Sequence, residues 1–150
     1  MASLREQLVG AWELVPYSLL ATDGTDRIHP LGQEPRGTIL YSACGYMSAQ
    51  LMRPGRTKFA SSDWSSGTPA EYKEQSAGYL AFSGRFETDE NEKLVKHHVS
   101  VSMFPNWEGQ IQVRRARIEG EMLLLGTESA VPRGNASYMA KITWKRVQPV

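Results

Sequence analysis

The stretch of chain from residue 96 to residue 120 gathers side chains that can move protons and bind oxygen atoms. It contains the adjacent imidazoles of His97 and His98, the amide of Gln112 and the guanidinium of Arg114. Imidazole titrates nearest to neutral pH, so either histidine is a candidate acid or base. An amide and a guanidinium are donors that stabilise negative charge on a reacting oxygen. We therefore treat His97, His98 and Arg114 as candidate catalytic residues and Gln112 as a substrate-binding residue.

Each of these residues also has a structural explanation. A strand histidine is more often solvated or hydrogen-bonded than catalytic, and Arg114 could instead be buried against a carboxylate. Neighbouring residues on a strand point to opposite faces, so His97 and His98 cannot hold one metal ion together. The remaining histidine is His29, and the sequence has no glycine-rich nucleotide-binding motif. We therefore predict no metal site and no cofactor.

The alternation of the strand that carries the histidines decides which of them faces the interior. Its odd-numbered residues, from Val95 to Met103, are mostly apolar, and its even-numbered residues are mostly polar. The apolar set is the natural inner set, which predicts His97 inside and His98 outside. A bulge near the pair would exchange the two histidines, because one extra residue inverts the alternation. The choice between His97 and His98 stays open at this point.

The next hairpin is expected to bring Gln112 and Arg114 to the same cavity. A two-residue loop at Glu119-Gly120 would pair Arg114 with Leu125. The opposite face of this hairpin carries two further arginines, which prefer water. The expected inner face holds Gln112, Arg114, Ala116, Ile118, Leu123 and Leu125.

A hairpin near the start of the chain supplies further candidates. Its expected strands are 37–42 and 46–52, joined by a tight turn at residues 43–45. We expect Tyr41, Gln50 and Met52 to bind the substrate, since a mixture of aromatic, amide and thioether groups is typical of a small-molecule pocket. They would share their face with Ile39, Tyr46 and Ser48. The opposite face, which is the alternative inner face, holds Leu40, Met47, Ala49 and Leu51.

Residues after the histidine pair complete the candidate site. Asn106 and Trp107 are expected to form the rim of the cavity mouth, although their turn could equally be a rigid connection. Ser102 is interpreted as a strand hydroxyl that contacts the substrate. It is not a candidate nucleophile, because no Gly-x-Ser-x-Gly elbow surrounds it.

Two short helices are expected outside the strands. Ser3 and Glu6 have the spacing of a capping box and predict a helix at the N-terminus. Thr68 and Glu71 have the same spacing, with a proline between them at the first helical position. The polar loop before this second helix, residues 53–67, is long enough to suggest a lid or a binding loop.

The remaining pattern predicts a closed sheet. A strand over residues 12–20 and the first hairpin are followed by five strands with hairpin-length connections. The total of about eight is the number at which a small barrel closes around one ligand. We therefore predict one all-β domain over residues 1–150, an antiparallel β-barrel of about eight strands with one or two short helices.

Composition narrows the classes of partner. The 17 basic and 16 acidic residues leave a formal charge of +1, which provides no field for a polyanion or an anionic membrane surface. The N-terminal segment lacks the unbroken apolar run of a secretory signal or a membrane span. The single cysteine, Cys44, excludes an internal disulfide, in keeping with a reducing compartment. We expect a cytoplasmic protein that binds neither nucleic acid nor membrane, and its oligomeric state stays open, with a homodimer as one alternative.

Four segments of the chain resemble a known family of small barrels. They are GAW at 10–12, TILYSACGYMSAQLMRP at 38–54, TPAEYKEQSAGYLAFSGRFE at 68–87 and HHVSVSMFPNWEGQIQVRR at 97–115. Together they are similar to the lipocalin-like domain of small bacterial and fungal proteins. The resemblance covers nearly the whole chain and implies a calycin-type barrel with an apolar cavity. It also implies that a basic residue late in the chain, Arg146 or Lys145, covers Trp12. Secreted lipocalins have signal peptides and disulfides that this chain lacks, so their transport roles do not carry over.

Two hypotheses of different class follow. The resemblance implies a link to natural-product biosynthesis, where related barrels act as cofactor-free cyclases or isomerases. The first hypothesis is an intracellular enzyme that rearranges a polyketide or terpenoid intermediate by acid–base catalysis. The alternative is a binding protein that carries a hydrophobic small molecule without chemistry. The polar residues expected inside favour the enzyme, because an all-apolar wall would better suit a carrier of an apolar ligand.

Overall fold

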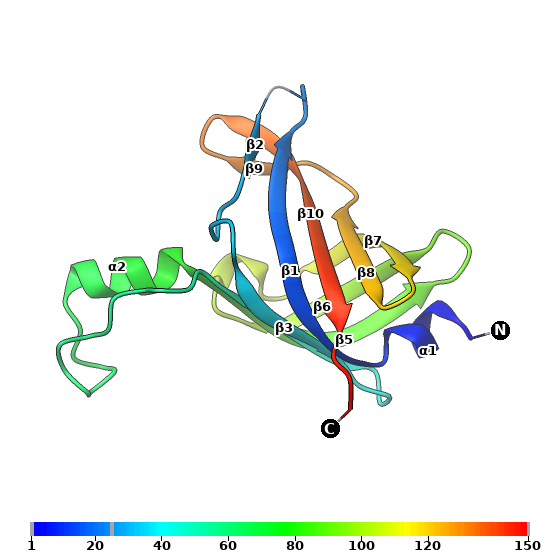
Figure 1. Cartoon of the computed structure of the whole chain (residues 1–150), viewed down its shortest axis with the longest axis horizontal. Helices are drawn as coiled ribbons and strands as arrows, with labels where there is room; N and C mark the ends of the chain where they lie inside the picture. Colours follow the sequence, from blue (N-terminus) through cyan, green and yellow to red (C-terminus); the bar gives the residue numbers. More distant parts are fainter. Residues whose placement is uncertain (1, 25, 150) are drawn as a thin grey trace.

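The first long strand of the chain pairs with the last, and this pairing closes the sheet. In the computed structural model, which describes residues 2–24 and 26–149, β1 (Gly10–Ala21) runs antiparallel to β10 (Ala136–Arg146). Within the described residues the strand order is β2-β1-β3-β4-β5-β6-β7-β8-β10-β9. Eight strands form the barrel, and two short ones, β2 and β9, extend its rim (Figure 1). The other bounds are β2 (Arg27–Ile28), β3 (Arg36–Tyr41), β4 (Tyr46–Met52), β5 (Tyr79–Asp89), β6 (Leu94–Ser102), β7 (Ile111–Glu119), β8 (Met122–Thr127) and β9 (Val131–Arg133). The predicted antiparallel barrel of about eight strands is confirmed.

Both predicted helices form, and each begins at its predicted capping box. The hydroxyls of Ser3 and Thr68 accept hydrogen bonds from the backbone N–H groups of Glu6 and Glu71. The two glutamate side chains accept hydrogen bonds from the N–H groups of the capping residues in return. These reciprocal bonds satisfy donors that a helix N-terminus leaves without intrahelical partners. The helices are α1 (Leu4–Leu8) and α2 (Pro69–Ala77), with a 3-10 turn, η1 (Pro105–Trp107), between β6 and β7.

The helix α1 closes one end of the barrel. Its Leu8 is fully buried, and the Leu8 carbonyl accepts a hydrogen bond of 2.9 Å from the indole N–H of Trp12. The guanidinium of Arg146 lies 4.1 Å from the Trp12 ring centroid and donates to the carbonyl of Val9. Arg146, and not Lys145, is therefore the basic residue over Trp12. This contact joins the start of β1 to the end of β10.

The register of the β7–β8 hairpin differs from the expected one by two residues. Glu119 pairs with Met122 and Arg114 with Thr127, so the pairing of Arg114 with Leu125 was wrong. The loop consists of Gly120 and Glu121, and Gly120 has φ +60°, which suits glycine at the first central position of a type II′ turn. A shift of two residues keeps every side chain on its predicted face, because side chains alternate with a period of two.

The segment over residues 53–78 forms an arm that projects away from the barrel (Figure 1). The arm is held by its own contacts, since Glu74 accepts from the Thr57 N–H and the Tyr72 hydroxyl bonds to Trp64 and Gly67. Its helix α2 buries no side chain. The arm contributes no residue to the wall of the cavity that lies inside the barrel. It therefore does not cover that cavity as a lid in this structure. No helix among the described residues is long and apolar enough to cross a membrane.

Candidate functional site

A cavity of about 370 Å³ lies inside the barrel at the end opposite α1. A volume of this size can hold one small organic molecule. Most of its wall is apolar and comes from alternate residues of the strands, while η1 and β9 contribute to its open end. The polar or charged residues of the wall are Tyr17, His97, Gln112, Arg114, Thr127 and Arg133, and the aromatic ones include Phe82, Phe104, Trp107 and Trp144.

His97 is the histidine that faces the interior. Only 2% of its surface is exposed, and its Nε2 lies 2.7 Å from the hydroxyl of Tyr41. Burial lowers the pKa of His97 to about 3, and the positive charge of Arg114 acts in the same direction. His97 is therefore neutral at ordinary pH. Burial also raises the pKa of Tyr41, which keeps the phenol protonated.

The tautomer of His97 follows from its partners. If the Tyr41 hydroxyl donates to Nε2, the imidazole carries its proton on Nδ1 and one N–H remains without a partner. The opposite arrangement would leave both the Tyr41 proton and the Nδ1 lone pair unpaired. The first arrangement leaves fewer buried polar groups unsatisfied, and it is favoured for this reason. His97 therefore keeps one free N–H donor.

His98 lies on the outer face of the barrel. Its Nε2 is 2.7 Å from a carboxylate oxygen of Glu87 on the neighbouring strand β5. The hydrogen bond to His98 lowers the pKa of Glu87. The prediction of His98 as a catalytic residue in the cavity is therefore wrong. The two histidines lie on opposite faces of β6, and of the two it is His97 that lines the cavity.

The inward and outward alternation of β6 is interrupted by a bulge, which lies three residues after His97 and so does not exchange the two histidines. Ser83 pairs with Val101 and Gly84 pairs with Val99, so Ser100 is an extra residue on β6. After this bulge Val101 is turned outward and 66% exposed, although the simple alternation placed it inside. Ser102 takes the inward parity, and its Oγ is buried without a hydrogen-bond partner. Ser102 does not line the cavity.

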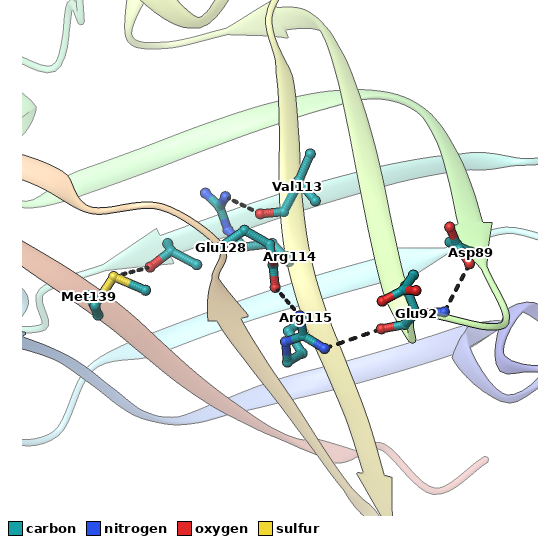
Figure 2. A network of polar contacts seen from close by, with 8 residues as sticks. Asp89, Glu92, Val113, Arg114, Arg115, Glu128 and Met139 are labelled. Carbon is teal, nitrogen blue, oxygen red and sulfur yellow. Dashed lines mark hydrogen bonds and ion pairs between the residues drawn. The ribbon is translucent and has the colours of Figure 1, made fainter.

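Arg114 and Gln112 lie side by side on β7 and both line the cavity. The Nη2 of Arg114 donates to the Gln112 side-chain oxygen at 3.3 Å, and Nη1 donates to the carbonyl of Val113 at 3.0 Å. Burial lowers the pKa of Arg114, yet a guanidinium remains charged at neutral pH. Figure 2 shows the contact between Arg114 and Val113 together with the outward contacts of the next residue, Arg115. Within the described part of the chain, two of the five N–H donors of Arg114 are used.

In the first hairpin, the predicted inner face is correct for Tyr41 and wrong for Gln50 and Met52. Ser42 and Tyr46 are opposite each other across a three-residue loop, so Tyr41 pairs with Met47. An odd loop length keeps the odd-numbered residues of both strands on one face, and this face is the inner one because Tyr41 and Met47 are both buried. Gln50 and Met52 point outward, and both border a shallow groove on the outer surface. Tyr41 supports His97 and does not itself line the cavity.

Of the two residues predicted at the cavity rim, η1 places one in the cavity wall and the other in solvent. Trp107 lines the cavity and packs edge-to-face on Phe82 with ring centroids 5.6 Å apart. Asn106, predicted with Trp107 at the rim, is exposed and does not line the cavity. The structure thus brings together His97, Gln112, Arg114 and Trp107, and leaves His98, Gln50, Met52, Ser102 and Asn106 outside the cavity wall.

Several lining residues escaped the sequence reasoning. Tyr17 is the main one, because the pairing of β1 with β10 shifts between Leu14 and Tyr17 and turns odd-numbered residues inward after the shift. Pro16 in the middle of this strand was an available signal, since proline within a strand often accompanies a bulge. Arg133 on β9 had no such signal, because the strand has only three residues.

Metal ligation has no support in the part of the chain that the structure describes. No group of three or more His, Cys, Asp or Glu side chains there is placed to hold an ion. The cavity instead offers hydrogen-bond donors within an apolar wall. Such a site can bind and orient an oxygen-bearing organic molecule.

Comparison with known proteins agrees with this geometry. A family model described as the lipocalin-like domain matches residues 9–147. The 4'-hydroxy-3'-methoxypropiophenone carrier protein ppsC of Aspergillus oryzae is 35% identical over 107 residues. The match covers 67% of this chain and 96% of that protein.

Proposed function

This chain belongs to the lipocalin-like domain family, and we propose that it carries a hydrophobic small molecule in the cavity of its barrel. The observation that supports this most directly is the cavity of about 370 Å³ with its mostly apolar wall and few polar groups. This combination is typical of binding sites for small organic ligands. No transport role was expected from the sequence, because secreted lipocalins have signal peptides and disulfides, but the relative named as a carrier protein supports such a role.

The ligand that we propose is an aromatic ketone or a related product of biosynthesis. The relative named as a carrier of 4'-hydroxy-3'-methoxypropiophenone supports this class. That compound combines a phenol ring with a ketone, and the cavity wall combines aromatic rings with the donors of Arg114 and Gln112. Aromatic rings favour stacked or edge-to-face contacts with a planar ligand. The groups of the cavity wall thus suit those of the ketone, in addition to the sequence similarity to the relative named as its carrier.

Binding of this ketone to the purified protein tests the proposal. We expect saturable one-to-one binding in isothermal titration calorimetry. Trp107→Ala should weaken the affinity about tenfold, because it removes an aromatic contact at the cavity mouth. The matched control is Trp64→Ala, since Trp64 is 84% exposed on the arm and lies outside the cavity wall. The proposal is wrong if the ketone and related aromatic ketones give no heat of binding to the folded wild-type protein.

A second candidate function is a cofactor-free isomerase or cyclase. It is favoured by Arg114, whose charge inside the cavity would stabilise an enolate formed from a ketone. It is weakened by His97, because a base with a pKa of about 3 is poorly matched to proton abstraction near neutral pH. We therefore place the carrier first. Turnover of a candidate intermediate that is lost in His97→Ala with ligand affinity kept would reverse this order, whereas His98→Ala should change neither.

A further inference from the structure

We propose that the cavity binds its ligand as an anion, an aromatic compound whose ionised oxygen pairs with Arg114. This inference deepens the carrier function proposed above and depends on it, because it concerns the ligand of the same cavity. It adds the charge state of the ligand, which neither the family nor the relative's name specifies.

The cavity wall is positively charged in a protein whose charges otherwise nearly cancel. The chain has 17 basic and 16 acidic residues, but the cavity wall contains Arg114 and Arg133 and, among the described residues, no aspartate or glutamate. Two cations near a space with apolar walls attract an anion more strongly than they would in water, because the local dielectric is low. The electrostatic environment therefore selects against cationic ligands and favours anionic ones.

Arg114 has no carboxylate partner in the described part of the chain. Its two protein contacts are to neutral oxygens, those of Val113 and Gln112. The Arg114 side chain is partly buried, and a charge withdrawn from water without an opposite charge is costly, so proteins usually pair it. Three N–H donors of Arg114 remain after these two bonds. A ligand oxyanion in the cavity would complete the missing pair.

The titratable groups that face Arg114 cannot supply the anion themselves. Tyr17 on β1 and Tyr41 on β3 both have their pKa raised by burial, so both phenols stay protonated at neutral pH. His97 on β6 is neutral, and Arg133 on β9 adds a second positive charge near Tyr17. The structure leaves the counter-anion of Arg114 to come from outside the protein.

An acidic side chain that borders the same outer groove as Arg114 is already paired. Glu128 borders a groove on the outer surface together with Arg114, but its carboxylate contacts Arg115 at 2.9 Å. Arg115 faces outward and also donates to the carbonyl of Glu92 on the β5–β6 turn (Figure 2). Consecutive arginines on β7 therefore differ: the outer one has an acidic partner, and the inner one has none.

The aromatic side chains in the cavity wall indicate that the ligand is aromatic. Phe82 and Trp107 form an edge-to-face pair at one side of the cavity, and Tyr17 and Trp144 contribute further rings. A planar aromatic ligand can pack on these rings while its oxygen reaches Arg114. The inferred ligand is thus an aromatic oxyanion, such as the phenolate of an acidic phenol.

A pair of probes that differ in one proton tests the inference. We would use 4-nitrophenol, whose phenol and phenolate absorb at different wavelengths, and 4-nitroanisole, its methyl ether that cannot ionise. We expect the wild-type protein to bind 4-nitrophenol at least about tenfold more tightly, as a charge-assisted hydrogen bond would require. The bound probe should show phenolate absorption at a pH where the free probe is still a phenol.

Variants of the two neighbouring arginines assign the effect. Arg114→Gln should remove the preference for 4-nitrophenol, and Arg114→Lys should keep part of it because the positive charge remains. Arg115→Gln, the matched outward control, should leave the preference unchanged. If Arg114→Gln does not fold, the wild-type probe pair and Arg114→Lys still decide the question.

The outcomes separate this inference from the proposed function. Equal affinity for the two probes, or a bound 4-nitrophenol that keeps the phenol spectrum, overturns the anion inference and leaves the carrier function intact. Failure of the wild-type protein to bind either probe or any neutral aromatic ketone overturns both. A preference that survives Arg114→Gln but is lost in Arg115→Gln also overturns the inference, because it would place the anion on the outer face.

Discussion

At the scale of single residues, the pair formed by His97 and Tyr41 shows how burial sets chemistry. The same imidazole that looks like an acid–base catalyst in the sequence is enclosed by apolar neighbours, lies beside Arg114 and is held neutral. His98, one residue further on, pairs with Glu87 at the surface. Identical side chains thus have different roles because they occupy opposite faces of one strand.

The buried imidazole should make folding stability depend on pH. His97 has a folded-state pKa of about 3 and an ordinary value of 6.5, so between these values the unfolded chain binds a proton that the folded chain does not. Stability is therefore lost as the pH falls below 6.5, by up to about 1.4 kcal/mol for each pH unit. Urea unfolding between pH 7 and pH 5 measures this slope, above the range where most carboxylates titrate.

Two histidine variants assign this pH dependence. His97→Gln should flatten the slope between pH 6.5 and pH 5, because glutamine does not titrate. His98→Gln on the outer face is the control and should keep the slope. A wild-type slope in His97→Gln would show that another group is responsible.

At the scale of elements, the bulge in β6 determines which side chains at the end of that strand face inward. The bulge lies at Ser100, opposite the boundary between Ser83 and Gly84. A side chain at residue 84 would begin 1.8 Å from the carbonyl oxygen of His98. Only glycine allows β5 and β6 to approach this closely, and the approach holds the backbone next to His97.

Gly84→Ala should therefore destabilise the protein strongly, by about 3 kcal/mol or more, since the obstacle is backbone and cannot rotate away. The control is Gly126→Ala on β8, where an added Cβ would meet its nearest atom at 3.8 Å. That variant should stay within about 1 kcal/mol of wild type. Urea unfolding of the two variants gives the comparison, and similar stabilities would contradict the role assigned to the bulge.

At the scale of the whole molecule, closure of the barrel depends on the contact between its first and last strands. β1 and β10 pair along most of their length, and Arg146 adds its cation–π contact with Trp12 and hydrogen bonds to the carbonyls of Gln7 and Val9. One side chain thus connects β10, β1 and the segment after α1. The cavity opens at the opposite end of the barrel, where η1 and β9 contribute to its wall.

Arg146→Ala should lower the free energy of unfolding by about 1 to 3 kcal/mol, because it removes a cation–π contact and two charge-assisted hydrogen bonds. Lys145→Ala is the neighbouring control on the exposed side of β10 and should change stability by less than about 0.5 kcal/mol. Thermal or urea unfolding measures both. Equal effects of the two substitutions would contradict the assignment of Arg146 as the closing residue.

The sequence by itself determined the local features of this protein. Capping boxes at Ser3 and Thr68, the β-hairpins and the inward face of Arg114 all follow from rules that involve residues close together in the chain. Tertiary structure alone decided two other features: the position of the bulge at Ser100 and the neutral state of His97. These depend on which strand lies opposite and on what surrounds a side chain. Neither is encoded by the alternation of a single strand, because alternation fixes only relative faces within one uninterrupted run.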